Sequence, residues 1–385
     1  MKYLILLILT QIIPVLMSNN KKWNHPIKYW VDIYDFKDII YDFLKKIEDQ
    51  TCITFLNRPT YIEGEQGLLF LKTEDRTYSQ HIGPSGTNQP NNIFVKYYWD
   101  IKHHKGLIED AIFNALGAGP ENQRCDRDEY LTMHKDRAKK EFLNDFNYNN
   151  YSCSFIKGTV AYDYGSLTHD TVWNKEISDK GPIFETKQFK NLYQKMMGHK
   201  EHAVFSDYKK LYFIHCSDKC KNLLNMCQHG GYPNAKNCKE CICPHGYLGK
   251  HCETYVTSVL QVLIGPISSY GSIFLYATES SKEWGTTDRA IFYIFIIAPK
   301  NNRVYVRHKS SKSCYYNGDY CFDQRGHEIR YRADKGAMGI CLCGAIDWPL
   351  DIVSEDNEVA IFYRGDCSYQ LMLFDYQIHN ENSKI

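Results

Sequence analysis

The chain has 385 residues, 15 cysteines and a formal net charge of +1 at pH 7. So small a net charge excludes the strongly basic surface through which many proteins bind nucleic acid or anionic membranes. The length suits two or three domains, and the 30 tyrosines and 19 phenylalanines favour packed, β-rich domains over disorder.

The N-terminal residues 1–18 predict a secretory signal peptide. Lys2 supplies a short basic region, the run from Leu4 to Ile13 is mostly apolar, and Ser18 is a small residue suited to cleavage. The alternative is a membrane anchor, but the apolar run is shorter than the about 20 residues that a spanning helix needs. No later segment is long and apolar enough to span a bilayer, so we expect a secreted, extracellular product.

Two amphipathic helices are predicted in the first half of the chain. Apolar residues recur at helical spacing over 36–48 and again over 106–117. Gly117 is suited to end the second helix, because glycine readily adopts the left-handed conformation of a C-terminal cap. Strand-like segments lie between the helices at 67–73 and 92–99.

The cysteines are unevenly spaced, which predicts a larger domain, a small disulfide module and a third domain. Three cysteines are widely spaced before residue 216, seven lie from Cys216 to Cys252, and five lie after Cys252. In a secreted protein, cysteines predict disulfides rather than free thiols.

The crowded segment, 217–253, resembles an EGF-like module in its Cys-x-Cys pair, glycine–aromatic–glycine turn and final cysteine. A module this small buries too little apolar surface to fold without disulfides. A zinc ribbon built on Cys238, Cys241 and Cys243 is the alternative, but the secretory context favours disulfides. The residues before the first cysteine of the module lack the acidic pattern of calcium-binding EGF modules, so we expect no calcium there.

The last part of the chain, 254–385, predicts an all-β domain. Short strands separated by turn residues are typical of a β-sandwich. Segments in which apolar residues alternate or run together lie at 291–299, 303–308, 327–333, 358–364 and 370–378.

Several short motifs, taken in order, resemble the astacin family of zinc metalloproteases. Residues 21–35 resemble the start of an astacin catalytic domain, and 46–55 resemble its first cysteine motif. Residues 161–170 resemble the segment that forms the Met-turn, and 209–216 resemble the last cysteine of the domain. Each match is weak alone, but their order and spacing together are specific.

The resemblance extends to the nematode arrangement of protease domain, EGF-like module and CUB domain. It implies an α+β astacin-like (metzincin) domain over 19–216. This domain would be followed by the EGF-like module at 217–253 and a CUB-like, all-β sandwich at 254–385.

The segment 110–130 keeps the shape of the family's catalytic motif but not its chemistry. Active astacins carry HExxHxxGxxHE before a tail similar to RPDRDEY, and this chain reads DAIFNALGAGPENQRCDRDEY. Asp110, Asn114 and Pro120 stand at the positions of the three histidine zinc ligands, and Ala111 stands at that of the general-base glutamate. A carboxylate can bind zinc, but an amide is a poor ligand and proline has no side-chain donor.

Two neighbouring positions in the Met-turn segment have also changed. Thr168 stands where the family has methionine, and Asp170 stands where it has tyrosine. His169 is retained, although this histidine is not a metal ligand in the family. We therefore expect no bound cofactor, where the family holds zinc.

We expect a catalytically inactive homologue that binds an extracellular protein or peptide. The alternative is an active zinc metalloprotease with an unorthodox metal site built on Asp110. A third interpretation is a decaying gene whose product misfolds.

The tail that follows the motif is preserved, which predicts a folded scaffold. By the resemblance, Glu121 matches the glutamate that pairs with the mature N-terminus of active relatives. Arg124, Asp126 and Arg127 match the structural residues of the family tail.

The resemblance also implies disulfide pairs. Cys125 and Cys153 are left as a candidate pair in the first domain. The five cysteines of the CUB-like region predict one that is free or intermolecular. The pairs implied by the family are Cys52–Cys216, Cys220–Cys238, Cys227–Cys241 and Cys243–Cys252.

Other candidate chemistry is weakly supported. His103, His104 and His134 lie near the motif, but adjacent histidines do not easily face one ion, and solvated loop histidines are the simpler interpretation. Ser166 lacks the strand–turn–helix context of a nucleophilic serine. Asn150 begins an N-glycosylation sequon, for which an ordinary polar loop is the alternative.

Overall fold

A computed structural model describes residues 22–97, 105–171, 180–257, 271–313, 320–323, 325–365 and 369–380. The predicted signal peptide lies outside the described residues, as do His103, His104, Cys314 and Cys367.

The N-terminal part is built on a five-stranded sheet with the strand order β2-β1-β3-β5-β4. Neighbouring strands are parallel except for the antiparallel edge strand β4. The strands are β1 (Ile27–Val31), β2 (Phe55–Asn57), β3 (Leu68–Thr73), β4 (Tyr78–Ser79) and β5 (Asn91–Lys96).

Helices α1 (Lys37–Gln50) and α2 (Lys105–Ala115) pack against this sheet in one hydrophobic cluster. On α1 the buried residues are Ile40, Leu44 and Ile47, whose spacing is that of one helical face. Both predicted helices are therefore confirmed, each with shifted ends.

Helix α2 ends at Ala115, and Gly117, the predicted cap, lies in the turn that follows, with a backbone φ of +102°. The Gly117 amide donates to the Asn114 carbonyl at 2.9 Å, and the Ala118 amide donates to the Phe113 carbonyl at 3.0 Å. These bonds satisfy carbonyl groups at the helix end, in a conformation that residues with a side chain rarely adopt.

Short elements connect α2 to the last helix of this part, α5 (Phe205–His215). Strands β6 and β7 form an antiparallel pair among them. The elements are η3 (Glu121–Gln123), η4 (Arg127–Glu129), β6 (Leu131–Met133), η5 (Lys135–Arg137), η6 (Lys140–Phe146), α3 (Asn150–Ile156), β7 (Phe184–Thr186) and α4 (Lys190–Tyr193).

The cysteine-rich segment that follows has little regular structure. It contains η7 (Lys221–Leu223) and two antiparallel pairs of short strands, β8 (Tyr232–Pro233) with β9 (Cys241–Ile242) and β10 (Tyr247–Leu248) with β11 (Thr254–Tyr255).

Six disulfides lie within the described residues, and Cys341 is a buried free thiol there. The bonds are Cys52–Cys216, Cys125–Cys153, Cys220–Cys238, Cys227–Cys241, Cys243–Cys252 and Cys321–Cys343.

The C-terminal part consists of two β-sheets, which confirms an all-β region. One has the order β12-β14-β20-β16-β17, and the other has the order β13-β21-β15-β18, with β19 also paired to β15. The strands are β12 (Ser272–Tyr276), β13 (Lys282–Thr286), β14 (Ile291–Ile297), β15 (Val304–Lys312), β16 (His327–Arg330), β17 (Ile340–Leu342), β18 (Ala345–Ile346), β19 (Leu350–Val353), β20 (Glu358–Arg364) and β21 (Leu371–Ile378).

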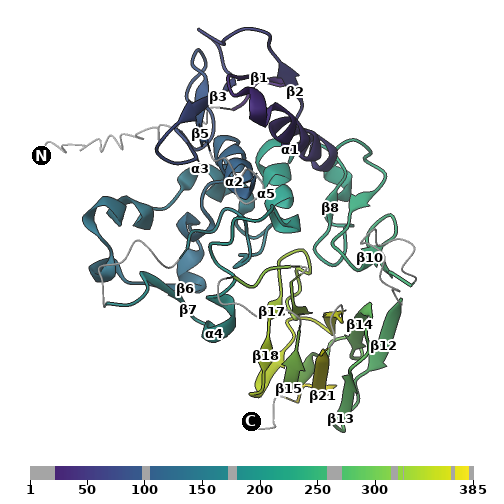
Figure 1. The fold of residues 1–385 in the computed structure, drawn as a ribbon. Coiled ribbons are helices and arrows are strands. Elements are labelled where there is room, and N and C mark those ends of the chain that lie inside the picture. Colours follow the sequence, from purple (N-terminus) through teal and green to yellow (C-terminus); the bar gives the residue numbers. More distant parts are fainter. Residues whose placement is uncertain are drawn as a thin grey trace, which may run out of the picture.

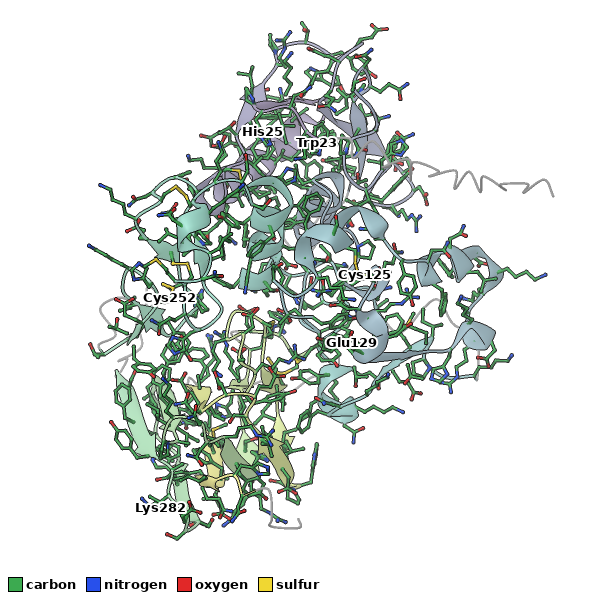
Figure 2. All side chains as sticks on the ribbon, turned by 180° about the vertical axis from the view of Figure 1, so that it is seen from behind. Trp23, His25, Cys125, Glu129, Cys252 and Lys282 are labelled. Atoms are coloured by element: carbon green, nitrogen blue, oxygen red, sulfur yellow. A yellow bond between two sulfur atoms is a disulfide. The ribbon has the colours of Figure 1, made fainter. Side chains whose placement is uncertain are left out.

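The two-sheet part packs directly on the N-terminal part, with α4 beside β17 (Figure 1). A single hydrophobic cluster includes Tyr164 and Met196 from the N-terminal part and Ile329 and Met338 from the sheets. Figure 2 shows Trp23 and His25 at one end of the molecule and Lys282 at the other.

Candidate functional site

The site lies on one face of α2, where Asp110 and Asn114 are one helical turn apart. The Asn114 Nδ2 donates to the Asp110 main-chain oxygen at 2.9 Å and to Asp110 Oδ1 at 3.1 Å. The first two expected ligand positions therefore bond to each other. The remaining side-chain oxygen, Asn114 Oδ1, is buried and has no hydrogen-bond donor among the described residues.

A lysine ammonium lies against the other carboxylate oxygen of Asp110. The Lys200 Nζ is 3.1 Å from Asp110 Oδ2. The same ammonium donates to the main-chain oxygens of Leu167 at 2.6 Å and His169 at 3.2 Å. Lys200 thus joins α2 to the 161–170 segment. The sequence showed the changed ligand positions but did not predict a role for Lys200.

The loop that carries Lys200 crosses the start of α2 at close range. A Cβ atom at Gly106 would lie 1.9 Å from the Lys200 main-chain oxygen, so only glycine permits this approach. The loop is also anchored at its other end, where the Ala203 amide donates to Glu109 Oε2 at 2.9 Å. The carboxylate of Glu109 accepts a second bond, from the Tyr208 hydroxyl at 3.0 Å.

Two of the expected catalytic positions contribute no polar side-chain atom. Ala111 is buried in the hydrophobic cluster of the N-terminal part. Pro120 precedes η3 with extended backbone angles. Neither residue can bind a metal ion or accept a proton through its side chain.

The 161–170 segment uses its own polar groups internally. Both ring nitrogens of His169 are engaged: Nδ1 donates to the Asp170 main-chain oxygen at 2.9 Å, and Nε2 accepts from the Tyr162 hydroxyl at 2.8 Å. The Asp170 carboxylate accepts from Asn122 Nδ2 at 3.3 Å. His169 therefore has no ring nitrogen left for a metal ion.

A buried charge network lies around Glu121, close to the site. The Glu121 carboxylate is 2.5 Å from Lys210 Nζ and 3.0 Å from Arg124 Nη1, and it accepts from the Asp163 amide at 2.9 Å. Burial alone would raise the pKa of Glu121, but Lys210 and Arg124 outweigh burial and lower the pKa to about 2. Arg124 is held in turn by Asp126 at 2.8 Å.

Within the described residues, Glu121 pairs with a lysine side chain. The ammonium is that of Lys210 on α5, and the predicted mature N-terminus lies outside the described ranges. The first described residues lie elsewhere: Trp23 Nε1 donates to the Ala115 oxygen at 3.1 Å. Figure 2 shows Trp23 apart from Cys125 and Glu129, which belong to the tail that follows Glu121.

The other predicted candidates lie in structural positions. Ser166 is buried and donates to Asp207 Oδ1 at 2.5 Å. His134 lies 3.9 Å from Glu185, beside β6 and β7. Asn150 is the first residue of α3, and its side chain is outside the described residues.

The residues at the site do not fit a catalytic zinc ion. Such an ion takes three protein ligands, drawn from histidine, cysteine and carboxylate side chains. The site offers one carboxylate, bonded to an ammonium, together with amide and carbonyl oxygens. Within the described ranges, no three His, Cys, Asp or Glu side chains gather as a metal cluster. Burial raises the pKa of Asp110, and Lys200 opposes that shift.

Replacing Lys210 tests how much the fold depends on the buried pair. We expect Lys210→Met to lower the free energy of unfolding by about 3–5 kcal/mol, because it leaves the Glu121 carboxylate buried without its closest cation. Urea-induced unfolding of the purified chain measures the change. The control is Lys45→Met, since Lys45 is half exposed and lies 3.4 Å from Asp49, and such a solvent-exposed pair contributes little to stability. Equal losses for both variants would contradict a structural role of the network.

Three buried histidines make stability depend on pH. Burial lowers the pKa of His169, His199 and His215 from 6.5 to about 4. The unfolded chain therefore binds more protons than the folded chain between these values. The contribution of these neutral histidines to the free energy of unfolding is complete above pH 6.5. It falls as the pH drops towards 4, by up to about 3 kcal/mol per histidine.

The buried carboxyl of Asp163 changes the free energy of unfolding in the opposite direction over part of this pH range. Burial raises the pKa of Asp163 from 3.8 to about 6, so this group adds stability as the pH falls from 6 to 4. Burial also raises the pKa of Glu109, Asp110 and Asp207, so these carboxyls act in the same direction as Asp163. The contribution of a single histidine is therefore measured by comparing one variant with the native chain. Urea midpoints measured between pH 7.5 and 4.5 test the expectation, and His215→Gln should reduce the slope by one proton. An unchanged slope would contradict the assignment for His215.

Comparison with known proteins agrees with the motif order. Among curated relatives, zinc metalloproteinase nas-34 of Caenorhabditis elegans is 25% identical over 358 residues, covering 90% of this chain and 54% of its own length. Zinc metalloproteinase dpy-31 of Brugia malayi is 28% identical over 339 residues, covering 83% of this chain and 52% of its own length. The chain thus spans about half the length of these relatives.

Among solved structures, the chain is similar to high choriolytic enzyme 1, a hatching enzyme zinc-protease of Oryzias latipes. The identity is 18% and the TM-score 0.41, over 50% of this chain and 92% of the enzyme. Within the described ranges, no helix has the length and apolarity needed to cross a bilayer. The family model for the astacin peptidases matches residues 15–216. Since this match covers just over half of the sequence, the chain belongs to the astacin family.

Proposed function

We propose that this chain is a secreted, catalytically inactive member of the astacin family that binds an extracellular protein or peptide. The observation that carries the proposal is that Asp110, the only carboxylate among the four catalytic positions, is already bonded to other side chains. Asp110 is ion-paired with Lys200 and hydrogen-bonded to Asn114. Ala111 offers no base to remove a proton from water, a contribution worth roughly 10²–10⁴-fold in rate.

The intact interior supports a binding role over a decaying product. Arg124 and Lys210 are buried and each pairs with the buried Glu121, and such an arrangement is costly unless every partner is kept. The Cys52–Cys216 bond closes a long loop, which contributes on the order of 2–5 kcal/mol. A chain that retains these features while losing its catalytic side chains is suited to present a surface.

The proposal extends to localisation and to the C-terminal modules. Disulfides persist in oxidising compartments, which favours secretion through the predicted signal peptide at 1–18. We assign 217–253 as an EGF-like module and 254–385 as a CUB-like domain. The support is three disulfides within the first segment and two β-sheets in the second.

Metal content and proteolysis together test inactivity. The full chain, purified from culture medium, should contain no stoichiometric zinc by elemental analysis and should not cleave casein or a mixed peptide library. An active astacin relative serves as the positive control. One zinc ion per chain, with chelator-sensitive cleavage that is lost in Asp110→Ala, would establish the unorthodox protease instead.

A competition assay tests the binding role. The folded chain, in excess over the substrate, should slow cleavage of an extracellular protein substrate by an active astacin relative, because bound substrate is withdrawn from the enzyme. Cleavage of a short synthetic peptide by the same enzyme should be unchanged. The reduced and alkylated chain is the control, since it lacks the disulfides that hold the fold. No difference between folded and alkylated chain would refute competition for substrate.

A further inference from the structure

We infer that the Lys200 ammonium is a tethered cation that fills an oxygen-lined cradle and keeps metal ions out of it. The cradle consists of the Asp110 carboxylate and the main-chain oxygens of Leu167 and His169. The inference deepens the proposed function because it concerns the same site, but it does not depend on the identity of any partner.

The number of oxygens around the Lys200 ammonium equals the number of its N–H donors. A lysine ammonium has three N–H groups. Three oxygens surround Lys200 Nζ, at 2.6 Å from Leu167, 3.1 Å from Asp110 and 3.2 Å from His169. These oxygens come from two chain segments, α2 and the 161–170 segment, which the cation therefore holds together.

The ligand set around the ammonium indicates a site for a cation rather than an ordinary ion pair. Asn114, whose Nδ2 donates to Asp110 Oδ1, has a buried Oδ1 with no hydrogen-bond partner among the described residues, and an unsatisfied buried acceptor is uncommon in folded proteins. Carboxylate, amide and carbonyl oxygens are the ligands that hard cations such as Ca²⁺ prefer, and not the donor set of a catalytic zinc. Without Lys200, the cradle would carry an uncompensated negative charge.

The loop fixes the ammonium in place. Gly106 permits the Lys200 backbone to lie against the start of α2, and Ala203 ties the loop to Glu109. Gly198 has a φ of +88°, and a Cβ there would lie 2.5 Å from the Cα of Thr171. The cation is thus part of the chain at a fixed position, so a free ion must displace a tethered competitor.

The principal test removes the tethered cation. Terbium(III), a luminescent ion that uses the same oxygen ligands as Ca²⁺, is titrated into the full chain and into Lys200→Met. We expect Lys200→Met to bind one terbium ion at least about tenfold more tightly than the native chain, a difference of about 1.4 kcal/mol. The matched control is Lys200→Met with Asp110→Asn, which removes both charges and should lose the gain.

Two results would overturn the inference: Lys200→Met binding no more tightly than the native chain, or the double variant binding as tightly as Lys200→Met. If Lys200→Met is too unstable to purify, Lys200→Gln carries the same test, because its amide can still donate to the main-chain oxygens. A native chain that contains zinc and cleaves peptides would refute the proposed function. A metal-free native chain whose Lys200 variants gain no ion would refute only this inference.

A second experiment asks whether Lys200 also prevents reversion to a zinc site. Asp110→His, Ala111→Glu, Asn114→His and Pro120→His are combined, with and without Lys200→Met. We expect zinc by elemental analysis only in the combination that lacks Lys200. Equal zinc content in both combinations would contradict exclusion by the ammonium.

Discussion

The buried carboxylate of Glu121 connects the segments on which the site depends. It accepts hydrogen bonds from Arg124 in the tail after α2, from Lys210 on α5 and from the Asp163 amide. Lys210 also donates to Thr168 Oγ1 at 3.1 Å, within the 161–170 segment. A buried carboxylate is stable only while its partners remain in place, so this network fixes the segment whose carbonyl oxygens face α2.

Two lysines from one stretch of chain neutralise two carboxylates, one partly buried and one fully buried. Lys200 pairs with Asp110, and Lys210 pairs with Glu121. In active relatives, by the resemblance, a metal ion occupies the site beside α2 and a chain terminus pairs with the glutamate. In the described part of this chain, lysine side chains supply the positive charges beside Asp110 and Glu121.

The C-terminal sheets lie beside the N-terminal part (Figure 1) and contact residues next to the Glu121 network. The Asp163 carboxylate accepts from Ser206 at 2.6 Å and from the Met338 amide of the sheets at 3.0 Å. The Arg332 guanidinium donates to the Tyr162 main-chain oxygen and lies 5.2 Å from the ring of Tyr164. These contacts join the C-terminal sheets to the 161–170 segment.

The sequence by itself determined the local elements and the family. Periodicity predicted α1 and α2, Gly117 predicted the end of α2, and the motif order identified the changed positions Asp110, Asn114 and Ala111. Cysteine spacing predicted the division of the chain into three parts. The disulfide pairs within each part came from the resemblance, because six cysteines allow about fifteen pairings. The helices could be predicted because a single segment carries their whole hydrophobic pattern.

Only the tertiary structure decided which lysines pair with Asp110 and Glu121. Glu121 and Lys210 are 89 residues apart in sequence, and Arg332 reaches an oxygen 170 residues away. A lysine in a polar stretch ordinarily predicts a solvated side chain, and no local pattern distinguishes Lys200 from its neighbours. Its place beside Asp110 depends on a loop that crosses α2 at Gly106, and that crossing exists only once the segments have packed.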